Sequence, residues 1–314
     1  MRAVRIHAHG GPELLTVDEL PVPRPAPGEL LVRTTLVGVG RPVVRSARAM
    51  HVELPYAPGG DVVGRVEAVG DGVTGWEVGD RVVALAFGGA YADLVTVPSA
   101  FAAPVPDDVG DEAAVLLVRC GQVALSVLRA GRLEPGESVL VTGAAGGVGH
   151  LAVQLAPVLG ASRVVAAIGA DSPAKVEALR SMGADEVVTY AELAAGGIDP
   201  VDVVADGVGG DVQPAALAVL APFGRLVAFS AATPPVDVDQ LRLNARTVIG
   251  FAMAHYAGGR PDVYARHRVE LCDLHRDGRL RTLVDRVLPL EKAGHAHRAV
   301  ESREIVGRVL LRTS

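Results

Sequence analysis

The pattern of hydrophobic and polar positions changes partway along the chain. In the N-terminal third, short apolar runs with strand character are separated by turns rich in Gly, Pro and Asp. Such spacing predicts a compact β-barrel-like domain. Between residues 137 and 252, strand-like and helix-like segments alternate instead. This alternation predicts a parallel, doubly wound α/β sheet that binds ligands at the carboxyl ends of its strands.

The same pattern gives the expected elements and domains. In the α/β region, strands are expected at 138–142, 163–168, 186–189, 201–205, 225–230 and 247–251, and helices at 148–159, 173–182 and 211–221. Elsewhere, helices are expected at 107–130, 262–277 and 290–300, and strands at 284–289 and 308–311. Because the C-terminal tail is expected to return to the first domain, the predicted domains are 1–120 with 257–314, and 121–256.

A glycine-rich turn at residues 143–149 lies between the strand expected at 138–142 and the following helix. Gly146 and Gly147 carry no Cβ, so the backbone there can come close to a pyrophosphate. The helix N-terminus offers free N–H groups and the positive end of its dipole to phosphates. Strand, turn and helix together indicate a dinucleotide-binding motif. Since Ala144 replaces the first glycine of G-x-G-x-x-G, an ordinary tight turn remains the alternative.

Composition and charge argue against several classes of protein. The 314 residues are enough for two domains, and the net charge of −6 comes with no basic stripe, which argues against a nucleic-acid partner. No apolar run approaches the roughly 20 residues that span a bilayer, and the first residues have no apolar signal core. We therefore expect a cytoplasmic protein without a membrane partner. The only cysteines, Cys120 and Cys272, cannot form a four-cysteine zinc site.

Eight short motifs, taken together, connect the chain to a family. In chain order they are 58–64 (PGGDVVG), 78–82 (VGDRV), 89–92 (GAYA), 143–149 (GAAGGVG), 183–185 (GAD), 206–210 (DGVGG), 224–227 (GRLV) and 307–311 (GRVLL). On these motifs the chain resembles the zinc-independent medium-chain dehydrogenase/reductases, specifically the quinone oxidoreductase branch. The resemblance implies a GroES-like β-barrel catalytic domain, a Rossmann domain and an active site in the cleft between them. It also implies a homodimer joined through the edge strand near 247–251.

The resemblance also leads to predictions about a metal ion and about the cofactor. The positions that hold zinc ligands in metal-dependent relatives correspond to Gly40 and Gly60, which cannot bind a metal, so we predict none. Lys175 and Tyr190 match positions that hold the 2′-phosphate in NADPH-using members, which predicts NADPH as the cofactor. The alternative is a solvated helix-face lysine and a half-buried tyrosine at a strand end. Asp171, shortly after the second strand, is the main counter-indication.

Further cofactor contacts are expected at the turn and after the fifth strand. The residues predicted to hold the cofactor at the turn are Ala145, Gly146, Gly147 and Val148. By resemblance, Phe229 and Ser230 should lie near the nicotinamide, although Phe229 could be a core residue and Ser230 part of a turn. His150 could approach the phosphates, but a position on the helix face is the simpler interpretation.

The expected reaction is hydride transfer from NADPH to a small-molecule quinone or α,β-unsaturated carbonyl, which requires no nucleophile or metal. Two polar groups usual in the family are replaced, an Asn by Gly40 and a Thr by Val123. Tyr56 is the predicted proton or hydrogen-bond donor. Other residues that could line the cleft, each with a structural or surface role as the alternative, are Arg41, Arg45, Arg48, Arg119, Cys120 and Gln122.

Two other functions stay open. One is an enoyl reductase acting on a polyketide-like or carrier-tethered intermediate, for which the arginine-rich loop expected at 41–48 would suit an acidic carrier or substrate. The other is a repurposed, non-redox member of the fold, which Gly40 and Val123 favour. The glycine turn, Lys175 and Tyr190 favour a working reductase.

Overall fold

The computed structural model describes residues 1–48, 52–229 and 234–313. Its contacts divide the chain into two compact units, Met1–Arg119 with Val284–Ser314, and Cys120–Leu283. Residues 257–283, expected in the first domain, therefore fall in the second unit. The reason is helix α10 (Pro261–Arg276), which packs on helix α3 (Gln122–Ala130). The buried Gln122 amide donates to the Tyr264 oxygen at 2.8 Å, and Ser126 Oγ lies 3.1 Å from His267 Nδ1.

The first unit is built on a seven-stranded sheet ordered β14-β15-β3-β4-β5-β7, with β6 paired to β3, and a two-stranded sheet β1-β2. The strands are β1 Arg2–Ile6, β2 Leu15–Glu19, β3 Glu29–Val39, β4 Gly60–Val69, β5 Arg81–Ala86, β6 Leu94–Pro98, β7 Ala102–Pro104, β14 Val284–Pro289 and β15 Arg308–Arg312. The helices are α1 Arg41–Arg48, α2 Asp111–Leu116 and α11 Ala293–Glu301. Because β14 and β15 join the sheet, the C-terminal tail returns to this unit.

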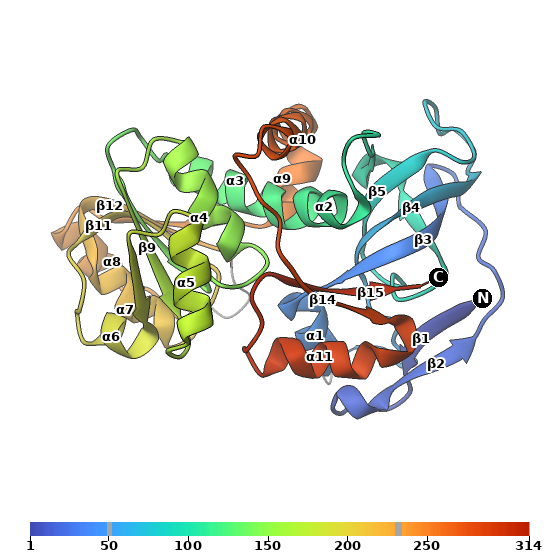
Figure 1. Ribbon diagram of the computed structural model, residues 1–314, viewed down its shortest axis with the longest axis horizontal. Helices are drawn as coiled ribbons and strands as arrows, with labels where there is room; N and C mark the ends of the chain where they lie inside the picture. Colours follow the sequence, from blue (N-terminus) through green and yellow to red (C-terminus); the bar gives the residue numbers. More distant parts are fainter. Residues whose placement is uncertain (49–51, 230–233, 314) are drawn as a thin grey trace. The chain divides into compact units, whose positions relative to one another are not determined.

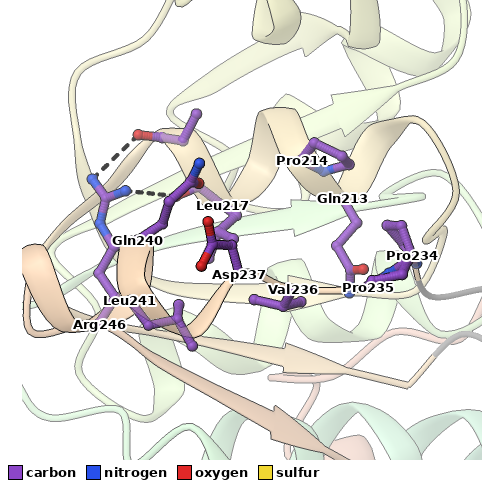
Figure 2. Close-up of a pocket in the computed structure, with 11 residues that line it drawn as sticks. Gln213, Pro214, Leu217, Pro234, Pro235, Val236, Asp237, Gln240, Leu241 and Arg246 are labelled. Carbon is purple, nitrogen blue, oxygen red and sulfur yellow. Dashed lines mark hydrogen bonds between the residues drawn. The ribbon is translucent and has the colours of Figure 1, made fainter.

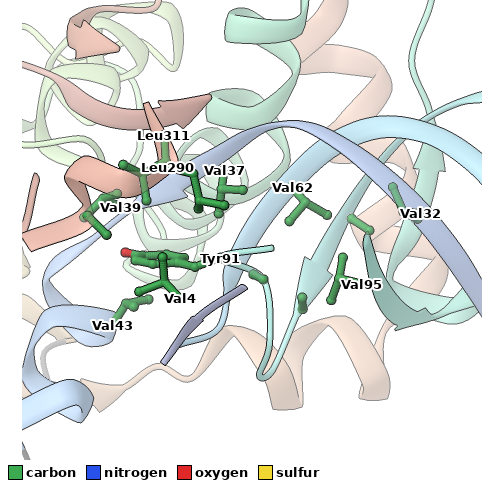
Figure 3. Packing of buried hydrophobic residues seen from close by; sticks show 14 of the residues in the cluster. Val4, Val32, Val37, Val39, Val43, Val62, Tyr91, Val95, Leu290 and Leu311 are labelled. Atoms are coloured by element: carbon green, nitrogen blue, oxygen red, sulfur yellow. The ribbon is translucent and has the colours of Figure 1, made fainter. Parts of the chain in front are cut away.

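The core of the first unit is formed by side chains from both sheets, from helices α1 and α11 and from the segment before α11. The ring of Tyr91 lies among apolar side chains that include Val4, Val39 and Leu290 (Figure 3). Its hydroxyl lies 3.1 Å from His297 Nε2, so the one polar atom of this core side chain is paired. Burial raises the pKa of Tyr91, which keeps the hydroxyl neutral.

The second unit contains a six-stranded parallel sheet ordered β10-β9-β8-β11-β12-β13. Counted along the chain this is the order 3-2-1-4-5-6 of a doubly wound dinucleotide-binding sheet. Its strands are β8 Ser138–Thr142, β9 Arg163–Ile168, β10 Glu186–Thr189, β11 Val201–Asp206, β12 Leu220–Ala228 and β13 Thr247–Gly250. The predicted α/β fold with a parallel Rossmann sheet is confirmed.

Helices connect these strands and cover the sheet. Helix α4 packs on β8 and β9, and α7 packs on β11 and β12 (Figure 1). The helices of this unit are α3 Gln122–Ala130, α4 Gly149–Val158, α5 Pro173–Ser181, α6 Tyr190–Ala194, α7 Val212–Ala218, α8 Val238–Leu243, α9 Met253–Gly259 and α10 Pro261–Arg276. The short helices α6 and α8 were not predicted, because five or six residues are too few to show a helical period.

Three elements differ from expectation. Residues 41–48 form helix α1 rather than a loop, because Val43, Val44 and Ala47 provide a buried apolar side. Strand β12 begins at Leu220, five residues before the predicted start, and ends at Ala228. The helix expected at 107–130 is divided into α2, a π-helix at Leu117–Gly121, and α3.

The stretch Asp111–Ala130 is long and apolar enough to pass as a membrane span, contrary to the expectation that no apolar run approaches that length. In the structure 83% of its apolar window is buried. Burial of this kind is typical of a core helix of a folded protein, so the stretch is weak evidence for a membrane.

An ion pair between the buried Arg225 and Glu137, whose side chain is 24% exposed, fastens β12 to the start of β8. The Arg225 guanidinium donates to Glu137 Oε1 at 2.7 Å and to Oε2 at 2.8 Å. Its Nε donates to the Gly131 oxygen at 2.8 Å, and the side chain is only 11% exposed. The hydrogen bonds from Arg225 hold the pKa of Glu137 below its ordinary value.

We expect Glu137→Gln to lower the free energy of unfolding near neutral pH by about 1–3 kcal/mol, because a buried guanidinium loses its charged acceptor. Since the folded-state pKa of Glu137 is below the unfolded-state value, this stabilisation is complete above the unfolded-state pKa. It is lost as the pH falls through the folded-state pKa. The difference between wild type and variant should therefore shrink as the pH falls below 4.5, measured by urea unfolding.

The matched control is Glu270→Gln. Glu270 also accepts from an arginine, Arg129, at 2.8 Å, but the two side chains are 33% and 39% exposed. Solvent screening should limit its loss to less than about 1 kcal/mol. Equal losses for the two variants would contradict a special role for the Arg225–Glu137 pair.

Candidate functional site

The glycine turn follows β8 and leads directly into α4. Gly143 has a φ of +64°, a conformation that favours glycine, and its oxygen accepts from the Gly146 N–H at 2.9 Å. A Cβ on Gly149 would lie 2.2 Å from the Gly143 oxygen and 2.6 Å from the Ala144 Cα. Only glycine therefore lets α4 approach the turn this closely. The N-terminus of α4, with the positive end of the helix dipole, therefore lies at the carboxyl end of β8, a position that suits a phosphate.

Asp206 joins the ends of the two central strands, β8 and β11. It is fully buried, and its Oδ1 accepts from Thr142 Oγ1 at 2.7 Å and from the Val208 and Gly209 N–H groups at 3.1 Å. This point, where the strand order reverses, is where doubly wound sheets bind ligands. Sequence reasoning included Asp206 in a motif but assigned it no role. Its signal was an acidic residue at the end of a buried strand, just before a glycine-rich turn.

Tyr190, the first residue of α6, contacts the glycine turn directly. Its hydroxyl accepts from the Gly143 N–H at 3.1 Å. The residue before it, Thr189, ends β10 and forms a capping box with Glu192, which fixes where α6 begins. The side chain is half-buried, as the alternative interpretation expected, and its hydroxyl is directed to the turn. Contact between Tyr190 and a 2′-phosphate stays a prediction.

Lys175 lies in the first turn of α5, shortly after the carboxyl end of β9. Its side chain is buried, with the residue only 7% exposed. The alternative interpretation as a solvated helix-face residue therefore does not fit. Asp171 precedes it in an exposed loop. The structure places Lys175 and Tyr190 after adjacent strands, β9 and β10, at the same edge of the sheet.

Phe229 lies immediately after β12, and its N–H donates to the Asp206 oxygen at 3.0 Å. Its ring faces Gly207, where a Cβ would lie 2.6 Å from the ring Cζ. Phe229 therefore lies at the carboxyl end of the central strands, and its proximity to a nicotinamide stays a prediction. Ser230, the other residue predicted there, lies outside the described residues.

In the first unit, Tyr56 is held by its backbone, which exchanges hydrogen bonds of 2.8 and 2.9 Å with Ile6. Its half-buried hydroxyl bonds to Ser46 of α1 and to the backbone of Gly59. Burial raises the pKa of Tyr56, and these two hydrogen bonds only partly offset it. The hydroxyl therefore keeps its proton at neutral pH, as a proton or hydrogen-bond donor must.

The packing around position 40 explains why a glycine stands there in place of the Asn usual in the family. A Cβ on Gly40 would lie 2.8 Å from Nη1 of Arg308, whose Nη2 donates to Asp61 Oδ1 at 2.5 Å. Two residues earlier, in β3, a Cβ on Gly38 would lie 2.0 Å from Asp61 Oδ2. Asp61 is fully buried, and Arg119 Nε lies 3.7 Å from the same Oδ1. The space that an Asn at position 40 would need is occupied by a buried ion pair.

The other candidate residues divide into two groups. Arg41 and Arg45 are exposed on α1, whereas Cys120, Gln122 and Val123 are buried. The side chain of Arg48 lies outside the described residues.

A cavity of about 240 Å³ lies between α7, α8 and the segment before α8 (Figure 2). It was not predicted, and none of the predicted site residues is among those that line it. Gln213 of α7 borders it with a side chain that is 2% exposed, and Arg246 closes the other end. The cavity is therefore separate from the glycine turn.

Comparisons with known proteins agree with this geometry. One family model, described as an alcohol dehydrogenase GroES-like domain, matches residues 26–107, and another, described as a zinc-binding dehydrogenase, matches residues 182–311. The chain is 30% identical to the synaptic vesicle membrane protein VAT-1 homolog of Rattus norvegicus, over 99% of this chain and 84% of that protein.

Two solved structures are similar over their whole length. A mycobacterial protein in complex with NADPH has a TM-score of 0.92 and 33% identity, covering 100% of both chains. A quinone oxidoreductase of Escherichia coli in complex with NADPH has a TM-score of 0.91 and 29% identity, also covering 100% of both. The chain therefore belongs to the medium-chain dehydrogenase/reductase family of oxidoreductases and is quinone oxidoreductase-like, as expected from its motifs.

Although one family description mentions zinc, residues 1–48, 52–229 and 234–313 contain no group of three or more His, Cys, Asp or Glu side chains that could hold a metal ion. The two positions expected from metal-dependent relatives are occupied by Gly40 and Gly60, which have no ligand atom to offer.

We expect Gly40→Ala to lower the free energy of unfolding by about 1–3 kcal/mol, because the new Cβ displaces the buried guanidinium of Arg308. The loss should be smaller in an Arg308→Lys background, where the shorter cationic head leaves room for the methyl group. A double-mutant cycle of urea unfolding measures this coupling.

Gly88→Ala is the control, since the nearest atom to a Cβ at that position is 3.9 Å away. A Gly40→Ala penalty that is the same with Arg308 and with Lys at position 308 would contradict the explanation.

Proposed function

We propose that the protein is an NADPH-dependent, metal-independent oxidoreductase that reduces a quinone or an α,β-unsaturated carbonyl. The observation that carries the proposal is the glycine turn at the carboxyl end of β8, closed so tightly by Gly149 that a side chain there is excluded. Such a turn, at the point where a doubly wound sheet reverses its strand order, is the place where these sheets hold a pyrophosphate. NADPH complexes of two similar structures support the same cofactor.

The residues present fit this cofactor. The backbone of Ala145, Gly146, Gly147 and Val148 would bind the pyrophosphate. The ammonium group of Lys175 would pair with the 2′-phosphate, beside the Tyr190 hydroxyl. A charged group buried as deeply as Lys175 requires a compensating partner, and a ligand phosphate would strengthen that compensation. Phe229 and Ser230 would border the nicotinamide, after the last residue of β12.

When bound, NADPH supplies the hydride, and the chain's own residues do the rest. They orient the ring, limit access of water and donate a hydrogen bond to the oxygen on which negative charge develops. Tyr56 is the proposed donor in the first unit, which we assign as the catalytic, GroES-like domain. Its protonated hydroxyl could stabilise an enolate or a hydroquinone anion and then deliver the proton.

Partners and location are further parts of the proposal. Strand β13 is at the end of the sheet order, and pairing of two such strands across a two-fold axis would join two sheets into a homodimer. The net charge of −6 supports the expectation that nucleic acid is not a partner. We also propose a cytoplasmic location without a membrane partner, supported by the burial of Asp111–Ala130.

A second candidate function is an enoyl reductase for carrier-tethered or polyketide-like intermediates. It is favoured by helix α1, on which Arg41 and Arg45 are exposed one helical turn apart. Two cations on one side of a helix would suit an acidic carrier or an anionic substrate. Faster turnover of a carrier-bound enoyl thioester than of free quinones would favour this candidate.

We expect purified protein to consume NADPH in preference to NADH with small quinones or enones, followed by nicotinamide absorbance. Lys175→Ala should lower kcat/KM for NADPH by about 10–100-fold, because a charge-assisted contact to the 2′-phosphate is lost. It should change kcat/KM for NADH little, because NADH has no 2′-phosphate.

Lys292→Ala, at the only other lysine, is the matched control and should leave both cofactors unaffected. Equal losses with NADPH and NADH would contradict the 2′-phosphate assignment. If wild-type protein neither consumes nor binds NADPH, the proposed function is wrong and the repurposed, non-redox fold is favoured.

We expect Tyr56→Phe to lower kcat by about 100-fold or more, the usual contribution of a positioned proton donor, while Kd for NADPH stays the same. Because the pKa of Tyr56 is raised above 10, its donor form persists through neutral pH and is lost only in strong base. The wild-type advantage should therefore be constant across the neutral range. Tyr256→Phe is the control, and unchanged turnover in Tyr56→Phe would remove Tyr56 from the site.

A further inference from the structure

His150, the second residue of α4, is completely buried and is held at both ring nitrogens. Nδ1 lies 2.9 Å from the Gly146 oxygen, in the glycine turn. Nε2 accepts from the N–H of Leu283 at 3.1 Å. The side chain therefore connects the turn to a segment more than a hundred residues later in the sequence, and it does not lie on an exposed helix face.

The two partners determine the tautomer of His150. The Leu283 N–H can only donate, so Nε2 must be the unprotonated nitrogen. The Gly146 oxygen can only accept, so Nδ1 must carry the proton. The imidazole is therefore neutral, with one donor and one acceptor in fixed directions.

The bond to Gly146 also fixes the neighbouring N–H group. The oxygen of Gly146 and the N–H of Gly147 belong to one planar trans peptide unit, in which they point in opposite directions. When His150 holds the oxygen, the Gly147 N–H is directed away from the imidazole. Gly147 is one of the residues proposed to bind the pyrophosphate. The oxygen of the same peptide unit, on Gly146, also accepts the first hydrogen bond of α4, from the His150 backbone N–H at 3.0 Å.

Residues 281–283, which His150 connects to the glycine turn, are also bound by a second side chain of α4. One turn further along α4, Gln154 Oε1 accepts from the Arg281 N–H at 2.8 Å, and its Nε2 donates to the Arg281 oxygen at 2.9 Å. The same Nε2 donates to the His150 oxygen at 2.9 Å. Two side chains of α4 thus fasten residues 281–283, the last residues of the second unit before the chain continues into β14.

We propose that His150 is a positioning residue that aims the Gly147 N–H at the pyrophosphate and couples nucleotide binding to the order of residues 281–283. The inference rests on the proposed function, because it assumes that the turn binds a dinucleotide. The connection is a continuous chain of hydrogen bonds from Leu283 through the imidazole to the Gly146–Gly147 peptide, and such chains strengthen cooperatively. By linkage, if order in residues 281–283 tightens nucleotide binding by some factor, the nucleotide favours that order by the same factor.

The first test compares His150→Phe with wild-type protein in NADPH titrations. We expect Kd to rise about tenfold, because the Gly146 oxygen loses the imidazole and keeps only the backbone N–H of residue 150, so the peptide that faces the pyrophosphate is held less firmly. Adenosine 2′-monophosphate has no pyrophosphate, so its Kd should not change in His150→Phe, although Lys175→Ala should raise it. Gln154→Met is the matched control, since it releases Arg281 but keeps the bond between the imidazole and Gly146, and it should raise Kd for NADPH clearly less than His150→Phe does.

The second test measures amide hydrogen exchange. In wild-type protein, saturating NADPH should increase the protection of the Leu283 amide, and in His150→Phe this increase should be absent. The nitrogen chemical shifts of His150 should show the Nδ1-protonated tautomer in the wild type. His150→Asn provides a conservative rescue, because a short amide can still donate to the carbonyl four residues earlier but does not reach Leu283. It should recover most of the NADPH affinity but not the protection of Leu283.

The possible outcomes distinguish a failure of the proposed role of His150 from a failure of the proposed NADPH-dependent function. An unchanged Kd for NADPH in a folded His150→Phe variant, or equal losses for NADPH and adenosine 2′-monophosphate, would overturn the positioning role. Equal weakening by Gln154→Met would do the same, since it would show a general loosening of α4. If wild-type protein binds neither nucleotide, the proposed function is overturned and the coupling with it.

Discussion

The close contact between Gly149 and the Gly143 oxygen determines the geometry on which the second unit's chemistry depends. Because no side chain fits there, α4 begins directly against the end of β8, and its first N–H groups meet the edge of the sheet. The next residue, His150, is thereby buried in reach of both Gly146 and Leu283. Tyr190 holds the turn from another strand end. One missing Cβ thus positions the helix, the histidine and the tyrosine around the same turn.

In the first unit, too, a glycine is required by its surroundings. There a large neighbouring side chain fills the space next to the glycine, whereas in the turn the backbone itself does so. The Arg308 guanidinium, paired with the fully buried Asp61, takes the space beside Gly40. A buried carboxylate needs such a partner, and the guanidinium of Arg308 lies where a side chain at position 40, just after β3, would begin. The missing Asn, which on the sequence alone favoured a degraded site, is therefore accounted for by packing.

The sequence predicted best where one local pattern decides the structure. The parallel strands β8 to β11 were placed within a residue, because buried runs such as 138–142 and 163–168 are bounded by clear turns. Strand β12 was placed late because its first half contains Pro222 and Phe223, and Phe223 has the unusual φ of +67°. Helix α1 was mistaken for a loop because its arginines mask a short apolar side.

By itself the sequence determined the family, the doubly wound sheet and the glycine turn, because each depends on neighbouring residues or on the order of motifs. Only the tertiary structure decided the burial of Lys175, the contact between Tyr190 and Gly143, and the roles of Asp206 and His150. It also assigned residues 257–283 to the second unit. The physical reason is that these features join residues far apart in the chain. Hydrophobic periodicity reports which side of an element is buried, but not which distant donor meets which acceptor.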